Sequence, residues 1–361
     1  MKSIYLILLA LLLSPATQAH IPKNPQNVSW GTYLAPDFVI GTPPALKNSR
    51  ISVAAAEGGN CKARIAQIVC SIPDLSGWKK CGEKNQAAIE KLEYIYDILQ
   101  KPMKKVFCTI STILVVDKME SLAMAGIMPG DQSFMALSRD FTERNLDPEA
   151  VFGWKEQKVF GANLPRYEVS KEGPQVWTKS NSPLQTLQFV VTHEFAHILD
   201  FANSANRFTC APGKDCKGDP KTPEEFFERQ KNLIPEMDSW GAFSWKNGLE
   251  PNDKNKYPLW DRLCFYDCDS VERLQLSEMH DFYSQLDRTN FVSTYASVNP
   301  YEDFAESTAF YFMTDNVYDL EFRVSTGKTI YFWEWKWSQL TKKNNWIELF
   351  YEGDLKYPKA H

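Results

Sequence analysis

The stretch of sequence that decides the fold is residues 182–203, which read SPLQTLQFVVTHEFAHILDFAN. Ser182 is a good helix N-cap, Pro183 suits a first turn, and Gln185 stands where the partner residue of a capping box belongs. Apolar side chains then recur at helical spacing, at Leu184, Leu187, Val190, Val191 and Ile198. We therefore expect one long helix that packs an apolar stripe against a core.

This helix carries the motif His193-Glu194-Phe195-Ala196-His197. Residues four apart project from one helix face, so both imidazoles can reach a single ion at about 2 Å. Glu194 is placed to take a proton from a metal-bound water rather than to bind the metal, as in the His-Glu-x-x-His sites of zinc peptidases. The alternative is two surface histidines on an amphipathic helix. The apolar flanks disfavour it, because buried histidines need partners.

A catalytic zinc site needs a third protein ligand and an open position. Asp200 stands where the elongated form of the motif would have a glycine, so the third ligand comes from elsewhere in the chain. His280 is one candidate. Glu302 is a better one, because it opens a helix predicted from Asn299 and Pro300, with Glu306 one turn further along the same face. One carboxylate could bind zinc while the other accepts a hydrogen bond from a ligand histidine.

Each of these residues also has a plain structural interpretation. Glu302 could be a capping-box residue, and Glu306 an exposed helix charge. His280 could be a surface histidine, and Asp200 either buttresses the site or is a charge at the helix end. The histidine motif favours the ligand interpretation for the two glutamates.

A second motif lies downstream, formed by Tyr295, Asn299, Glu302, Phe304, Ala305 and Glu306. With the histidine motif, it resembles the gluzincins, zincins whose third ligand is a Glu on a downstream helix, and among them the lethal-factor-like metallopeptidases. The resemblance covers about residues 180–315. It implies Glu302 as the third zinc ligand, Tyr295 as a metal-facing phenol and Glu306 as a supporting residue. The chain between His197 and Glu302 is longer than in typical members of that family, and a cysteine-bearing insertion accounts for the difference.

These residues predict one Zn²⁺ per chain and hydrolysis of peptide bonds by a zinc-activated water, with Glu194 as general base. Tyr295 would donate to the developing oxyanion, with His280 as the alternative donor. The expected partner is a peptide or protein substrate, and the sequence indicates no oligomeric state. Two other functions stay open: a zinc amidase acting on cell-wall peptides, and a non-enzymatic binding protein with a vestigial zinc site.

The N-terminus predicts export. Residues 1–19 have a short positive start, an apolar run and small residues at Thr17 and Ala19, which together indicate a cleavable signal peptide. The run is short for a membrane helix, which disfavours the alternative of an uncleaved anchor. We therefore expect a secreted or periplasmic protein with no stable membrane insertion after cleavage. The net charge of −5 argues against nucleic acid as a partner.

The cysteines predict disulfides, because an even number follows a signal peptide. Four precede the histidine motif and four follow it, and we expect pairing within each group, although the connectivity cannot be deduced. A thiolate zinc site is disfavoured, because no Cys-x-x-Cys pair occurs. The eight residues are Cys61, Cys70, Cys81, Cys108, Cys210, Cys216, Cys264 and Cys268.

The predicted fold class is α+β: a zincin-like domain whose active-site helix packs on a small sheet, with a helical half that supplies the third ligand. An extended arm over 20–60 would precede an N-terminal α/β region over 61–180. The catalytic region would cover 181–361, with the cysteine-bearing insertion at about 207–268. Local patterns predict a helix over 86–99 and strands over 106–116, 134–137 and 167–170. Alternating aromatics over 331–337 predict a strand and leave a helix open.

Overall fold

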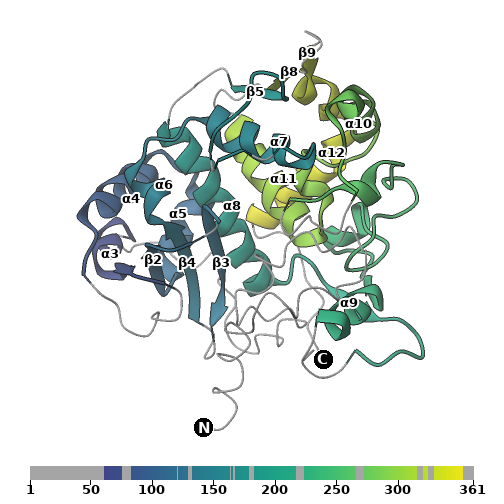
Figure 1. The fold of residues 1–361 in the computed structure, drawn as a ribbon. Coiled ribbons are helices and arrows are strands. Elements are labelled where there is room, and N and C mark those ends of the chain that lie inside the picture. The colour runs from purple at the N-terminus through teal and green to yellow at the C-terminus, as the bar shows by residue number, and fades with distance from the viewer. Residues whose placement is uncertain are drawn as a thin grey trace.

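The computed structural model describes residues 61–352, apart from 75–82, 120, 129–131, 163, 166, 179–182, 217–222, 266–271, 315–319 and 324–328. The predicted signal peptide and the predicted arm over 20–60 therefore lie outside the described residues, as does the predicted N-cap Ser182. Within the described residues the fold is mixed α+β, with helices around small sheets (Figure 1). This confirms the predicted fold class at that level.

The main sheet has four strands in the order β1-β2-β4-β3. Its parallel strands are β1 (Val69–Ile72), β2 (Thr112–Val116) and β4 (Gln132–Ser138), and β3 (Ala123–Met128) pairs antiparallel with β4 at one edge. Alternate residues of β2 enter two separate apolar clusters, Ile113 and Val115 in one and Leu114 and Val116 in the other. Both faces are thus buried, which explains why this strand is apolar from Ile113 to Val116.

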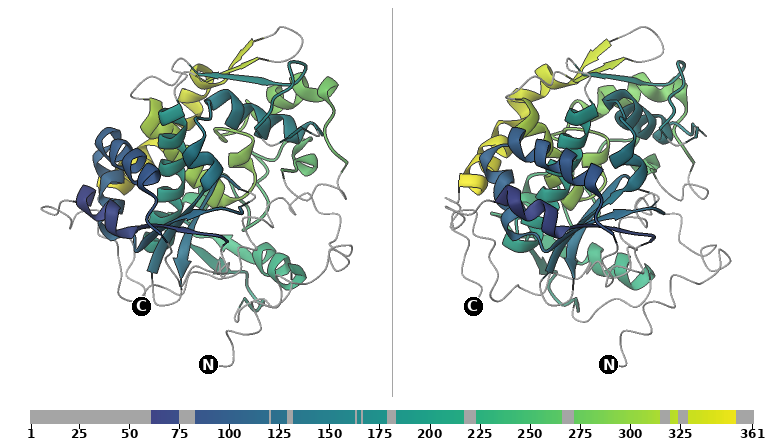
Figure 2. Two further views of the ribbon diagram at one scale, coloured as in Figure 1. Left: turned by 60° about the vertical axis from the view of Figure 1, so that its left-hand side comes forward. Right: turned by 90° about the vertical axis from the view of Figure 1, so that its left-hand side faces the viewer.

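Short helices pack beside this sheet: α3 (Cys61–Ile68), α4 (Gln86–Ile98), α5 (Lys101–Thr109) and α6 (Arg139–Glu143). Figure 2 shows α3, α4 and α5 gathered on the same side of the molecule as the sheet. The helix predicted over 86–99 is confirmed as α4, whose N-cap Asn85 accepts a hydrogen bond from the backbone N–H of Ala88. The strand predicted over 134–137 is confirmed within β4.

Two strand predictions in this region need correction. The segment 106–116 is a strand only from Thr112, because Val106 and Phe107 belong to α5. The Phe107 ring packs edge-on against Phe195 of the histidine helix at 4.8 Å, so tertiary packing overrides the strand preference of the β-branched residues. The segment 167–170 contains no strand. Tyr167 has φ 63°, a left-handed backbone that cannot continue a strand.

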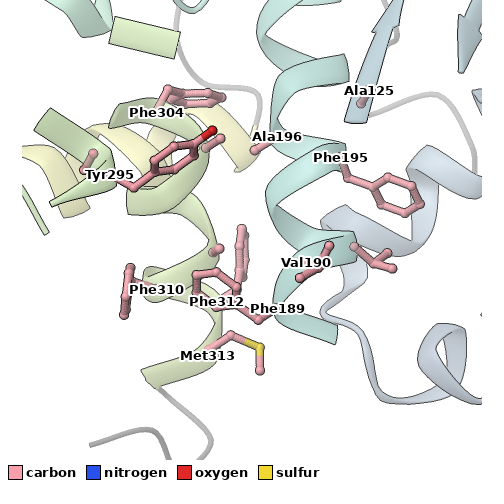
Figure 3. Close-up of a cluster of buried hydrophobic side chains, with 14 of the residues drawn as sticks. Ala125, Phe189, Val190, Phe195, Ala196, Tyr295, Phe304, Phe310, Phe312 and Met313 are labelled. Atoms are coloured by element: carbon pink, nitrogen blue, oxygen red, sulfur yellow. The ribbon is translucent and has the colours of Figure 1, made fainter. Parts of the chain in front are cut away.

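The histidine helix is α8 (Pro183–Asn203), and it lies between the sheet and α11 (Pro300–Thr314) (Figure 1). Nearly every side chain from Thr186 to Asp200 is buried, so the helix has no solvent face rather than one apolar stripe. Figure 3 shows the aromatic layer between α8 and α11, where Phe189 meets Phe310 edge-on at 5.2 Å. A single apolar cluster includes residues from both sides of position 180, and the predicted domain boundary there stays a prediction.

The second half of the fold is mainly helical. It contains the π-helical turn η4 (Glu149–Gly153), α7 (Trp154–Val159), the short turn η8 (Leu276–Glu278), α10 (Met279–Leu286), the 3₁₀ turn η9 (Tyr295–Ser297), α11 and α12 (Phe332–Glu352). The strand predicted over 331–337 is wrong, because α12 begins at Phe332. Trp346 and Phe350, one turn apart on α12, both pack against Phe304 of α11, and this contact favours the helix.

Two small sheets complete the described structure. Strands β5 (Gln175–Thr178), β8 (Leu320–Arg323) and β9 (Thr329–Tyr331) are antiparallel in the order β5-β8-β9. The insertion contains β6 (Phe208–Cys210), α9 (Pro223–Lys231), β7 (Leu233–Pro235), η5 (Trp240–Phe243) and η6 (Trp260–Arg262). In Figures 1 and 2 the three-stranded sheet and α9 lie at opposite ends of the molecule.

Disulfides are present both before and after the histidine motif. Cys61–Cys108 joins α3 to α5, and Cys210–Cys216 lies in the insertion, so both bridges stay within the predicted groups. Cys70 and Cys264 are also disulfide-bonded, whereas Cys81 and Cys268 lie outside the described residues. Such bridges are typical of an oxidising compartment. None of the helices in the described part of the chain has the length and apolar character needed to cross a membrane.

Candidate metal centre

His193 and His197 face each other inside the protein. Their Nε2 atoms lie 3.1 Å apart, and the two residues are only 8% and 7% exposed. Both lie on α8, one turn apart, as their spacing predicts. An imidazole nitrogen that carries no proton is an acceptor, so two buried nitrogens aimed at the same point call for a cation or a proton between them.

Glu302 reaches the same point from α11. Asn299 caps this helix, because its side-chain oxygen accepts the backbone N–H groups of Tyr301 and Glu302, each at 2.9 Å. The Glu302 side chain turns to the histidines instead, with Oε2 3.1 Å from His193 Nε2 and 3.4 Å from His197 Nε2. Glu302 is 2% exposed. The Glu302 carboxylate thus lies against the two histidines and does not cap the helix.

The three ligand atoms fit a metal ion. A tetrahedral ion with bonds of about 2.0–2.2 Å holds its ligand atoms about 3.3–3.5 Å apart. The separations of 3.1, 3.1 and 3.4 Å are close to that value. The buried group of His193, His197 and Glu302 can therefore hold a metal ion. Three protein ligands leave a fourth position open, but the identity of the metal does not follow from the distances.

Glu306 lies behind one of the candidate ligands. Its Oε1 lies 3.1 Å from His193 Nδ1, on the side of the ring that faces away from the other ligands, and its Oε2 accepts the hydroxyl of Ser293 at 2.7 Å. A carboxylate at Nδ1 keeps the proton there and leaves Nε2 free to bind. Burial alone would raise the pKa of Glu306, but Lys155 and His193 outweigh that effect and lower it.

The carboxylates also control the charge on His193. Burial alone would lower the pKa of His193, but Glu302 and Glu306 outweigh it and raise that pKa to about 10. The same contacts hold the pKa of Glu302 below its usual range, although burial opposes this. A cation that binds at Nε2 would therefore compete with a proton for His193.

Tyr295 contacts one of the three candidate ligands, and Glu194 follows another, His193, in the sequence. The Tyr295 hydroxyl donates to Glu302 Oε1 at 3.3 Å, and its ring lies 6.2 Å from the His193 ring. Figure 3 shows this residue beside the layer between α8 and α11. Glu194 is buried next to His193 on α8, and burial raises its pKa while the two histidines oppose that shift. The predicted roles of Glu194 as general base and of Tyr295 as a donor to the oxyanion stay predictions.

Asp200 and His280 take different places. Asp200 accepts the backbone N–H of Asn206 at 2.7 Å and its side-chain amide at 2.6 Å, and that amide also donates to the Pro300 carbonyl at 3.1 Å. It thus ties the end of α8 to the start of α11, which is the buttress interpretation. Burial raises its pKa to about 6. His280 is exposed at the start of α10, and among the described residues it is not part of the group around His193.

Two further residues reach this region without a signal in the sequence, Lys155 and Glu156 of α7. Lys155 Nζ lies 3.0 Å from the centroid of the Tyr295 ring and 3.8 Å from Glu306 Oε1. Glu156 accepts the hydroxyls of Thr294, at 2.5 Å, and of Tyr283. No spacing relates α7 to the downstream motif, and its charged residues read as an ordinary solvated helix face.

Comparison of the chain with protein-family models, with curated proteins and with solved structures found no match.

Proposed function

We propose that this protein is a zinc-dependent metallopeptidase of the gluzincin type, resembling the lethal-factor-like metallopeptidases, with Glu302 as the third ligand. The observation that carries the proposal is the convergence of two imidazole nitrogens and one carboxylate oxygen, all buried, within 3.4 Å of one another. The packing of α8 between a small mixed sheet and a helical half supports a zincin-like fold.

The donor set supports zinc in particular. Two histidines and one carboxylate around an open position form a set that catalytic zinc sites use, whereas magnesium and calcium favour oxygen ligands alone. One ion per chain follows from the single such group among the described residues. Bound zinc polarises a carbonyl oxygen and acidifies water, which is the chemistry that peptide hydrolysis needs.

The chain supplies the proton transfers and the orientation. Glu194 takes a proton on its carboxylate and passes it to the leaving nitrogen; its raised pKa suits a group that must both accept and release a proton. In this structure the Tyr295 hydroxyl donates a hydrogen bond to Glu302. During the reaction it would donate instead to the substrate carbonyl oxygen as that oxygen gains negative charge. Glu306 keeps His193 in the tautomer that binds through Nε2.

An extended peptide is the substrate class that the sheet favours. β3 is the antiparallel edge strand of the main sheet, and it is the strand that packs most closely on α8. An edge strand offers backbone donors and acceptors to a substrate that lies alongside it. The predicted signal peptide and the disulfides agree with a secreted or periplasmic enzyme.

Metal analysis of purified variants tests the proposal. We expect about one zinc per wild-type chain and far less in Glu302→Ala, because the carboxylate that faces both Nε2 atoms is removed. Glu306→Ala is the matched control, the same substitution one turn along α11. It should keep zinc with an affinity lower by about 10–100-fold, as expected for a residue that orients a ligand.

The outcomes separate the alternatives. Equal zinc in the wild type and in Glu302→Ala would contradict Glu302 as a ligand. A zinc-loaded wild type should cleave members of a mixed peptide library, detected by mass spectrometry. If it instead releases only cell-wall peptides from their amide linkage, the amidase replaces the peptidase. A loaded protein that cleaves neither would point to the binding protein.

A further inference from the structure

Helix α7 is held firmly from two sides. On one side, the Gln157 side chain donates to the carbonyls of Ser170 and Pro174 at 2.8 and 3.1 Å and accepts the Ser170 N–H at 2.7 Å. Gly173 lies so close to this amide that a Cβ there would collide with it. On the other side, Glu156 accepts the hydroxyls of Thr294 and Tyr283. The residue before Glu156 is therefore presented to the site in a fixed position.

That residue is Lys155, and its ammonium group lies between two functional side chains. Nζ is 3.8 Å from Glu306 Oε1 and 3.0 Å from the centroid of the Tyr295 ring. The side chain is only 22% exposed, and Glu306 is 3% exposed. Burial lowers the pKa of Lys155, and four nearby carboxylates, those of Glu306, Glu302, Glu156 and Glu194, oppose that shift.

We propose that Lys155 is a positioning residue of the metal centre: its ammonium group holds the Glu306 carboxylate against His193 and fixes the Tyr295 ring beside Glu302. The kinetic part of this inference rests on the proposed peptidase function, whereas the effect on metal binding does not.

The charge balance explains why a cation is needed at this place. A buried carboxylate is stabilised by a cation close to it. Lys155 Nζ lies 3.8 Å from Glu306 Oε1, and that same oxygen lies 3.1 Å from His193 Nδ1. Lys155 thus holds the carboxylate on the Nδ1 side of the imidazole, away from Nε2. The same ammonium group over the ring face restrains Tyr295, because a cation over an aromatic face is attracted to it, more strongly when both are desolvated.

Lys158 provides a matched control on the same helix. Its Nζ lies over the Trp154 ring at 5.0 Å, so it also makes a cation–aromatic contact, but with a ring outside the metal centre. Substitution of Lys158 thus removes the same type of side chain and the same charge from α7 without touching Glu306 or Tyr295.

The test compares Lys155→Met, Lys155→Arg and Lys158→Met in the full-length protein, loaded with Co²⁺. For Lys155→Met we expect a Co²⁺ dissociation constant about 10–100-fold higher than for the wild type, with a changed visible absorption spectrum. On a cleaved peptide, kcat should fall while KM changes little, because the residue orients groups and does not bind substrate. Lys155→Arg should recover most of the affinity, and Lys158→Met should match the wild type.

A double-mutant cycle with Glu306→Gln protects the test against a folding defect in Lys155→Met, because the double variant has no unpaired buried charge at this place. If Lys155 acts through Glu306, the double variant binds Co²⁺ about as tightly as Glu306→Gln alone. Additive losses would overturn the proposal, as would a Lys155→Met protein with wild-type affinity and spectrum. A wild type that binds Co²⁺ but cleaves no peptide would contradict the peptidase alone, and the affinities would still decide on Lys155. A wild type that binds no Co²⁺ would overturn both.

Discussion

Lys343 of α12 donates to both carboxylate oxygens of Asp303 on α11, at 2.6 and 2.7 Å, with both side chains almost fully buried. The indole N–H of Trp245 donates to the same carboxylate at 3.1 Å. Asp303 directly follows Glu302, so this buried ion pair anchors the turn of α11 that supplies the third ligand. The C-terminal helix thus supports the metal centre without touching it.

Loss of one partner of this ion pair should destabilise the folded protein. Lys343→Met leaves Asp303 buried with an uncompensated charge, and we expect the free energy of unfolding to fall by about 3–5 kcal/mol. Urea denaturation measures the loss. The adjacent Lys342 is exposed, so Lys342→Met is the matched control and should change stability by less than about 0.5 kcal/mol. Equal losses in the two variants would show that the ion pair does not anchor this turn of α11.

Metal binding should release a proton. Because Glu302 and Glu306 raise the pKa of His193 to about 10, the metal-free site carries a proton on His193 at pH 7, and a cation must displace it. We expect about one proton per ion at pH 7 and an affinity that tightens by about tenfold per pH unit between pH 6 and 8. Titration calorimetry in two buffers of different ionisation enthalpy counts the protons. An affinity that is constant over this range would contradict the charge assignment.

Glu156 should make stability depend on pH. Burial raises its pKa to about 7 from 4.5, and the two hydroxyl donors only partly oppose this. Between these pH values the folded protein holds a proton that the unfolded chain releases, so the contribution of Glu156 to stability falls as pH rises through this window. Glu156→Gln cannot ionise, and its carbonyl oxygen can still accept a hydroxyl.

The comparison of Glu156→Gln with the wild type isolates this group. We expect the variant to gain stability relative to the wild type between pH 5 and pH 8, measured as the difference in urea midpoints at each pH. A difference that stays the same at both values would mean that Glu156 does not titrate in this range.

The sequence predicted correctly those features that depend on residues close together in the chain. The spacing of His193 and His197 and the Asn299 cap each depend on one helical turn, and the structure has both. The segment 106–116 shows the opposite case. Its β-branched residues indicate one strand, but Phe107 packs on Phe195 from a distant part of the chain, and that contact makes the first residues helical.

Residues recruited from other elements could not be found in the same way. Lys155 joins the site only because Gln157 and Glu156 fix α7 against segments remote in sequence. Similarly, the aromatic alternation after Tyr331 has the period of a strand, yet the contacts of Trp346 and Phe350 with Phe304 place it at the start of a helix. In both cases the structure of the segment depends on contacts with residues that are distant in the sequence.

Glu194 should be dispensable for the metal and essential for turnover. It lies outside the group of three ligand atoms, so Glu194→Gln should retain about one zinc per chain. Its amide cannot accept a proton at the pH of the reaction, and loss of a general base reduces kcat by about 10²–10⁴-fold. Tyr295→Phe is a useful companion, because it keeps the base and removes only the hydroxyl that now binds Glu302. Metal analysis and peptide kinetics on the same preparations separate the two roles. Normal turnover in zinc-loaded Glu194→Gln would exclude Glu194 as the base, whereas loss of zinc in that variant would make it part of the metal site itself.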